Sequence, residues 1–328
     1  MIIESENIVK CPAISVIVIT YNQEKYIAQC LDSILSQRVN VPYELIIAED
    51  GGRDSTRDIC IQYQKAHPNL IRLLLQEHNK GISGNYADVL ALTRADYIAQ
   101  IGGDDFWCDE NKLQQQYDYM IANPKCGLCY TNVKSCDESG RIYIENFFEN
   151  KKLSTSFEEH LLNPCFMAPL TWMYKREVKE MFQDRGYTDE SVAMALEAFA
   201  NYDVHGFSTC TAVYRQTPNS ASTIVNPAQG FRQYKGVMDT QIYFAEKYKV
   251  SESLKDKILL RGYLQLLPMA IQIQNEEFVQ KARMFMISQG LDIDLIIREL
   301  KQGEICRRSK AYRIGKSLLK PFKWIKRM

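Results

Sequence analysis

The chain of 328 residues is 46% hydrophobic, which is enough to build a sizeable core in one large domain or in two. Lysine plus arginine and aspartate plus glutamate each number 40, so the overall charge gives no reason to expect a nucleic acid partner. No apolar run reaches the roughly 18–20 residues of a transmembrane helix, and no signal-peptide pattern opens the chain. Ten cysteines without such a signal indicate free thiols, and we therefore expect a cytoplasmic protein.

The N-terminal half of the chain alternates apolar runs with amphipathic segments. The β-branched run Ile14–Ile19 is typical of a parallel strand that is covered on both faces. Asn22 is a candidate N-cap for the helix that follows it. Strands that alternate with helices predict a Rossmann-like α/β fold, with a mostly parallel sheet flanked by helices. Further strands are predicted at 43–48, 70–75 and 96–101, and further helices at 54–65 and in a segment that ends near residue 92.

Two adjacent carboxylates, Asp104 and Asp105, follow an apolar strand and two glycines. Adjacent carboxylates repel each other, so keeping both ionised near a cleft requires a cation or a cluster of hydrogen-bond donors. Parallel strands end at the same edge of a sheet, where we expect this pair to meet Thr20–Asn22, Glu49–Asp50 and Asn79–Lys80. A solvated acidic turn explains the pair alone equally well, but the convergence favours a ligand site.

Two common phosphate-binding motifs do not occur in the sequence. No G-x-G-x-x-G follows the first strand, and there is no G-x-x-x-x-G-K-[ST]. A dinucleotide-dependent dehydrogenase and a P-loop enzyme are therefore unfavoured.

Several blocks of the sequence resemble the family 2 glycosyltransferases of the GT-A fold, over about residues 13–222. The first is Thr-Tyr-Asn at the end of the first strand, and the second is the acidic turn Glu49-Asp50-Gly. The others are Asn79-Lys-Gly together with Asn85, and Gly-Asp-Asp-Phe-Trp, a version of the family's metal-binding acidic motif. Each block alone is a weak signal, whereas their order and spacing together are a strong one.

The resemblance implies a nucleotide-sugar donor, a UDP-sugar, that lies across the edge of the sheet. Asp50 would hydrogen-bond to the base and Lys80 would belong to the same donor site. Asp104 would contact the ribose or the sugar, and Asp105 would hold Mg²⁺ or Mn²⁺ against the diphosphate. Hard divalent cations prefer carboxylate and phosphate oxygens, which agrees with this assignment. The nucleotide pocket would be lined by Thr20, Tyr21 and Asn22.

The resemblance also implies a catalytic base at Asp189, where a helix to about residue 200 is predicted to begin. An N-cap or a first-turn acid is the structural alternative, and Glu190 is the competing base. Many relatives carry a histidine where Thr217 stands, after the Tyr-Arg pair at 214–215. That departure leaves open whether another metal ligand takes the place of the histidine.

The activity that the resemblance implies is inverting transfer of a sugar to a hydroxyl of a glycan or polyprenyl-linked acceptor, in cell-surface polysaccharide or glycolipid synthesis. One alternative is a catalytically silent nucleotide-sugar-binding or assembly protein at the membrane. Another is a nucleotidyltransferase, which would need a glycine-rich basic loop after the first strand. Residues 20–25 have no glycine there.

The C-terminal third changes character, and we expect three domains: a GT-A catalytic domain at 1–225, a helical accessory region at 226–300 and a basic amphipathic tail at 301–328. From Arg307 to Arg327 there are nine lysines or arginines and no acid. Apolar residues recur among them at helical spacing. This pattern predicts binding to the anionic inner face of the cell membrane. A solvated tail, or one that binds RNA loosely, is the alternative.

Overall fold

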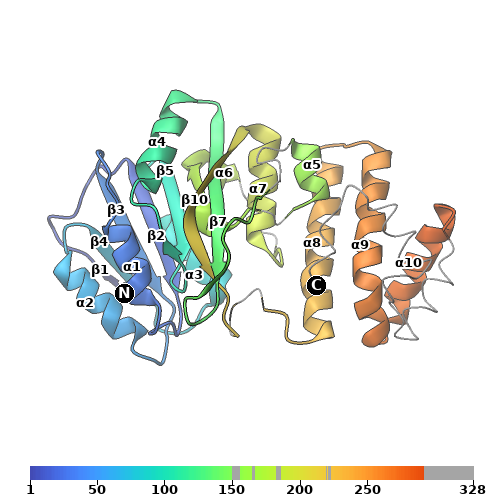
Figure 1. Cartoon of the computed structure of the whole chain (residues 1–328), viewed down its shortest axis with the longest axis horizontal. Coiled ribbons are helices and arrows are strands. Elements are labelled where there is room, and N and C mark those ends of the chain that lie inside the picture. Colours follow the sequence, from blue (N-terminus) through green and yellow to red (C-terminus); the bar gives the residue numbers. More distant parts are fainter. Residues whose placement is uncertain (150–155, 165–166, 182–185, 219, 221–222, 292–328) are drawn as a thin grey trace. The chain divides into compact units, whose positions relative to one another are not determined.

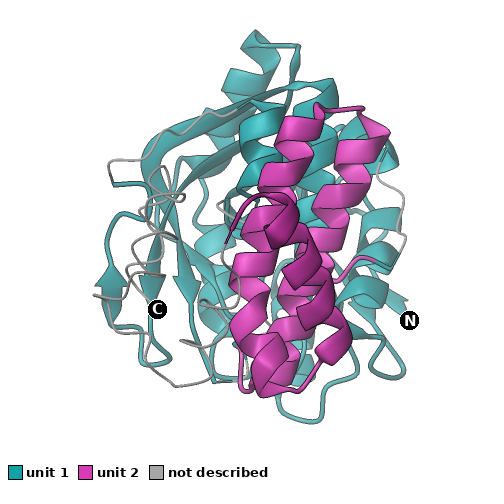
Figure 2. Cartoon of the chain, turned by 90° about the vertical axis from the view of Figure 1, so that its right-hand side faces the viewer, with its two compact units in different colours: residues 1–186, 190–223 teal, residues 187–189, 224–328 magenta. Residues whose placement is uncertain are grey.

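The computed structural model describes residues 1–149, 156–164, 167–181, 186–218, 220 and 223–291. The chain divides into two compact units, coloured separately in Figure 2: unit 1 holds residues 1–186 and 190–223, and unit 2 holds 187–189 and 224–328. Within the described ranges, no helix is both long enough and apolar enough to cross a membrane. The predicted basic tail, 301–328, lies outside the described residues.

Unit 1 is built on one ten-stranded sheet with the order β1-β4-β3-β2-β5-β9-β7-β10-β6, and β8 pairs with β7 (Figure 1). The neighbouring strands β4, β3, β2 and β5 are parallel, as is the long pair β7 and β10. The short strands pair antiparallel. The strands are β1 (Ile2–Ile3), β2 (Ile14–Thr20), β3 (Tyr43–Glu49), β4 (Ile71–Leu75), β5 (Tyr97–Gly102), β6 (Phe106–Trp107), β7 (Cys126–Cys136), β8 (Ile142–Ile144), β9 (Met173–Lys175) and β10 (Asp203–Arg215).

Helices cover both faces of this sheet. Alternate side chains of a strand point to opposite faces, so Val16 and Val18 pack in one core while Ile17 packs in the other. The first core includes residues of α1, α2 and α4, and the second includes residues of α3, α6 and α7. The expected α/β class is confirmed. The helices are α1 (Ile27–Leu35), α2 (Thr56–Ala66), α3 (Gly81–Ala91), α4 (Lys112–Ala122), α5 (Phe157–Leu162), α6 (Arg176–Met181) and α7 (Glu190–Asn201), with a 3₁₀ turn, η1 (Pro169–Thr171).

Unit 2 contains the expected C-terminal helical region, in which α8 (Pro227–Lys247) packs on α9 (Glu252–Gln272) and α9 packs on α10 (Glu276–Ser288). Each helix begins with a capping side chain: Asn226, Ser251 and Asn275 accept hydrogen bonds from backbone N–H groups of the first turn. Phe231, Leu267 and Met286 are among the residues of their shared core.

One predicted cap is wrong. The helix after β2 begins at Ile27, and Asn22 lies five positions earlier with a φ of +52°. Its side chain instead accepts a hydrogen bond from the N–H of Arg53, at 2.8 Å. Asn tolerates this left-handed backbone better than most residues, so it suits a turn that joins two loops.

Candidate active site

The carboxyl ends of β2, β3 and β5 lie side by side in unit 1. Thr20 is opposite Glu49 in the β2–β3 pair, and Ile19 is opposite Gly102 in the β2–β5 pair. The pairing of β2 with β3 extends one residue beyond the end of β3, where the N–H of Asp50 donates to the carbonyl of Thr20 at 3.0 Å. The structure therefore brings the first, second and fourth predicted polar segments to one edge.

Asp50 ties the acidic turn to the third polar segment. Its side chain is buried, and its Oδ1 accepts a hydrogen bond from the N–H of Lys80 at 2.8 Å. Gly51 has a φ of +70°, and a Cβ there would lie 2.7 Å from the carbonyl carbon of His78. The sequence needs glycine at this position, since any side chain would push the two loops apart.

The Lys80 side chain is engaged away from Asp50. Its Nζ lies 2.6 Å from Oδ2 of Asp88, and the same oxygen accepts a hydrogen bond from Gln76 at 2.7 Å. Both side chains of the ion pair are 38% exposed. An ion pair this exposed contributes only about 0–1 kcal/mol, so Lys80 can exchange its partner for a stronger anion.

The first polar segment divides into buried and exposed residues. Thr20 is buried and its hydroxyl donates to Oε1 of Gln23 at 2.8 Å, whereas Tyr21 is 41% exposed. A Cβ at Gly103 would lie 2.6 Å from that Gln23 oxygen. The Gln23 side chain also lowers the pKa of the Asp104 carboxyl. Gln23 thus joins the first loop to the acidic pair, a role that the sequence analysis missed.

Asp105 is buried and Asp104 is half-buried, next to the guanidinium group of Arg215. Asp105 is 7% exposed, and its Oδ1 accepts a hydrogen bond from the N–H of Arg215 at 2.8 Å. Burial raises the pKa of Asp105 well above its usual range, and the charge of Asp104 raises it further, against the opposing effect of Arg215. Burial also raises the pKa of Asp104, against the opposing effects of its own backbone N–H, the Gln23 side chain and the Arg215 charge. The pair holds more negative charge than its neighbours compensate.

Arg215 is the second residue that the sequence analysis left without a role. It is 3% exposed at the end of β10, and its Nε donates to the backbone carbonyl of Asp104 at 2.9 Å. Its Nη2 donates to Gln29 at 2.7 Å, and its guanidinium carbon lies 4.8 Å from the ring centroid of Tyr26. Arg215 therefore fastens the acidic loop to α1. The Tyr-Arg pair at 214–215 was the signal that could have found it.

The predicted base, Asp189, belongs to a different unit of the chain from the acidic pair. Asp189 immediately precedes α7, as expected, but it groups with unit 2, whereas the acidic pair belongs to unit 1. Thr217, where the family resemblance led us to expect a histidine, pairs with a neighbouring hydroxyl: its Oγ1 lies 3.0 Å from Oγ of Ser220. The described residues contain no group of three or more histidines, cysteines or acids that could hold a metal ion by themselves.

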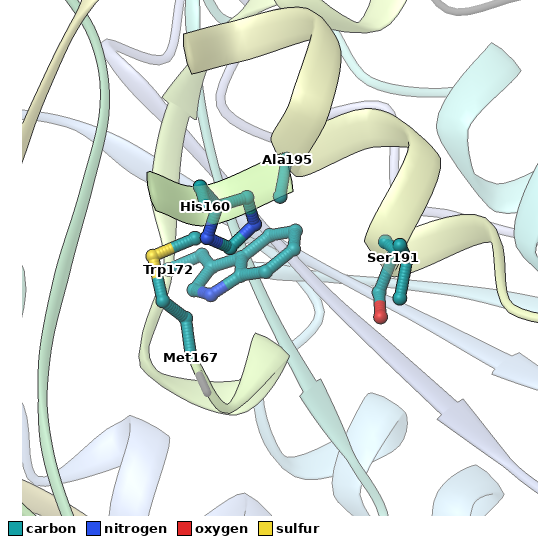
Figure 3. A pocket seen from close by; sticks show the side chains of 6 residues that line it. His160, Met167, Trp172, Ser191 and Ala195 are labelled. Atoms are coloured by element: carbon teal, nitrogen blue, oxygen red, sulfur yellow. The ribbon is translucent and has the colours of Figure 1, made fainter. Parts of the chain in front are cut away.

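A small pocket lies at the first turns of α7 in unit 1. Figure 3 shows His160 and Met167 next to the indole of Trp172, with Ser191 farther off. Trp172 is 1% exposed, and burial lowers the pKa of His160 to about 3, so this imidazole is neutral. The pocket volume is about 10 Å³, room for one water molecule and too little for a sugar.

Comparison with known proteins identifies the family. A profile described as glycosyl transferase family 2 matches residues 15–182. The chain belongs to this family of enzymes, and that expectation is confirmed.

Three similar proteins illustrate the relationship. The uncharacterized protein Rv1520 of Mycobacterium tuberculosis is 39% identical over 126 residues, which are 38% of this chain and 36% of that protein. TuaG of Bacillus subtilis, whose name assigns it to teichuronic acid biosynthesis as a glycosyltransferase, is 28% identical over 65% of this chain and 82% of its own length. Among solved structures, S. aureus TarS residues 1–349 in complex with UDP-GlcNAc superposes with a TM-score of 0.64 at 18% identity. That superposition covers 90% of this chain and 93% of TarS 1–349, and it supports the fold.

Proposed function

We propose that the chain is an inverting glycosyltransferase that moves a sugar from a UDP-sugar to a hydroxyl of a glycan or polyprenyl-linked acceptor, in the synthesis of a cell-surface polysaccharide or glycolipid. The observation that carries this proposal is the pair of adjacent carboxyls at the carboxyl edge of a parallel sheet, with Asp104 half-buried, Asp105 buried and the pKa of both raised. The UDP-GlcNAc complex of TarS and the teichuronic acid assignment of TuaG support the donor and the product class.

The donor would lie across the edge where the loops meet. We assign the uracil to Asp50, whose Oδ1 holds the Lys80 loop, and we assign Oδ2 to the base. Thr20, Tyr21 and Asn22 would line the nucleotide pocket. Lys80 would leave its exposed partner for a phosphate, since a doubly charged diphosphate attracts it more strongly than one carboxylate does.

The acidic pair fits a divalent cation. Both carboxyl pKa values are raised, so a positive charge nearby would favour the ionised forms. Asp105 would hold Mg²⁺ or Mn²⁺ and Asp104 would contact the ribose or the sugar. One or two carboxylates with phosphate oxygens and water make an ordinary shell for such ions. When bound, the ion neutralises the departing diphosphate.

The remaining requirement is a base for the acceptor hydroxyl, which we assign to Asp189. Its carboxylate would take the proton as the hydroxyl oxygen attacks the anomeric carbon, on the side opposite the diphosphate. Displacement in line, without a covalent intermediate, inverts the configuration at that carbon.

Loss of this base should slow the chemical step. We expect Asp189→Asn to lower kcat by about 10²–10⁴ while sparing the affinity for the donor. Glu190→Gln is the matched control, one residue along. A larger loss in the Glu190 variant would move the base to Glu190.

Product analysis tests the proposed activity against its alternatives. Incubation with a panel of nucleotide sugars, Mn²⁺ and candidate acceptors should release nucleoside diphosphate in step with glycosylated acceptor. Release of pyrophosphate in a parallel incubation with nucleoside triphosphates and sugar phosphates would indicate a nucleotidyltransferase. A donor that binds and remains intact would indicate the silent binding protein.

We also propose that the tail at 301–328 holds the protein on the inner face of the cell membrane. Each Lys or Arg near an anionic leaflet contributes about 1 kcal/mol, and burial of Leu318, Phe322 and Ile325 would add to that. Deleting 307–328 should release the protein from anionic vesicles in a pelleting assay and leave transfer to a soluble acceptor intact. Equal pelleting of both forms would reject this role for the tail.

A further inference from the structure

The segment Tyr187–Asp189 groups with the C-terminal helices although the residues on both sides of it belong to unit 1. Its Thr188 lies directly against Gly236 of α8. A Cβ at Gly236 would stand 1.8 Å from Oγ1 and 2.3 Å from Cβ of Thr188. The ring of Tyr187 is 6.3 Å from that of Tyr243 and 6.4 Å from that of the fully buried Phe244.

Only glycine permits this approach. The Thr188 hydroxyl could rotate away from an added methyl group, but its Cβ is fixed to the backbone, so the backbone of the segment would have to move. Gly within a helix costs roughly 0.5–1 kcal/mol relative to Ala. Helical propensity therefore disfavours a glycine at position 236. The glycine instead leaves the space that Thr188 occupies.

We propose that α8 supports the catalytic base, with Gly236 as a positioning residue that seats Thr188 and thereby fixes the adjacent Asp189. This inference rests on the proposed role of Asp189. It gives the helical accessory region a part in catalysis: the region sets the place of the group that receives the acceptor proton. A displacement on the order of 1 Å at such a group can lower a rate about 10²-fold.

The test compares two glycines of unit 2. A Cβ at Gly236 meets the short, rigid Thr188, whereas a Cβ at Gly262 of α9 meets the side chain of Met238, 2.4 Å from its sulfur. Methionine is flexible and can move aside. We expect Gly236→Ala to lower kcat about 10²-fold with the donor KM unchanged, and Gly262→Ala to leave both constants near their wild-type values.

A second substitution separates positioning from general damage. Thr188→Gly removes the three atoms nearest to the added methyl group, Oγ1, Cβ and Cγ2 of Thr188. Alone, this substitution should lower kcat by about tenfold, because the segment loses its contact with α8. The double variant should match Thr188→Gly, so kcat recovers from the Gly236→Ala level. Such non-additivity is the signature of residues in direct contact.

Three results would overturn the inference: wild-type kcat in Gly236→Ala, an equal loss in Gly262→Ala, or no recovery in the double variant. If Gly236→Ala does not fold, Thr188→Gly still decides, and an unchanged kcat there rejects the positioning role. Asp189→Asn is measured in parallel. An active Asp189→Asn enzyme refutes the assigned base, whereas an inactive one beside a fully active Gly236→Ala enzyme refutes the positioning role of Gly236 alone.

Discussion

The two edges of the same sheet each bury carboxylates, but they treat the charge differently. At the amino edge, Glu44 is fully buried and its two carboxylate oxygens accept hydrogen bonds from four donor groups. Ser15 donates at 2.7 Å, the N–H of Arg94 at 2.9 Å, the guanidinium of Arg94 at 3.0 Å and that of Arg72 at 3.2 Å. This carboxylate is a structural part of the fold, and its charge is neutralised within the protein.

At the carboxyl edge, Asp105 is almost as buried, yet its nearest charged neighbour in the chain is another acid. Asp105 accepts a hydrogen bond from the backbone N–H of Arg215. The Nε of Arg215 donates instead to the backbone carbonyl of Asp104. The difference teaches that burial by itself does not mark a functional acid. A buried acid marks a functional site when the protein supplies too few donors or positive charges to balance it, because a bound ligand can then supply the missing charge.

Replacing Asp105 should produce the largest effect on activity. Asp105→Asn removes a charged ligand and little volume, so we expect metal-dependent turnover to be lost. Both carboxyl pKa values are raised in the fold, so ionisation of the pair at neutral pH lowers the free energy of unfolding of the metal-free protein. Without metal, the variant should therefore be at least as stable as the wild type. Titration of Mn²⁺ against donor hydrolysis and a thermal melt check the two parts. Unchanged activity with unchanged Mn²⁺ affinity would exclude Asp105 as the ligand.

Replacing Glu44 should give the opposite pattern. Glu44→Gln leaves the buried Arg72 and the Arg94 side chain, which is 30% exposed, without this carboxylate, and removing one partner of a buried pair typically destabilises a protein by about 3–5 kcal/mol. We expect chemical denaturation to show a loss of this order, with kcat unchanged. Glu110→Gln breaks an exposed pair with Arg38 and should change stability by less than about 1 kcal/mol. Equal losses in the two variants would contradict the comparison.

The contrast between the edges follows from the sequence only in part. The alternation of apolar runs was enough to predict the parallel strands, and their shared direction was enough to predict that Thr20, Asp50 and the acidic pair lie at one edge. These inferences depend on local patterns and on a general rule of chain topology.

What the sequence did not predict depends on contacts between distant residues. Arg215 joins Asp105 across 110 positions, and Gln23 meets Asp104 through a close approach at Gly103. The Asn22 cap failed because the side chain bonds to Arg53 in another loop. No periodicity carries such information, since each contact is set by the packing of two elements that are separate in the chain.

The most direct test of the account is the dependence of UDP binding on a divalent cation. We expect UDP and Mn²⁺ together to raise the melting temperature of the wild-type protein, and UDP in EDTA to raise it much less, because binding to the native state stabilises it by mass action. Asp105→Asn should lose the Mn²⁺-dependent part of the shift, whereas Glu44→Gln, from its lower starting point, should keep it. Equal UDP-induced shifts with and without Mn²⁺, or a full Mn²⁺-dependent shift in Asp105→Asn, would contradict the claim that the acidic pair holds the cation.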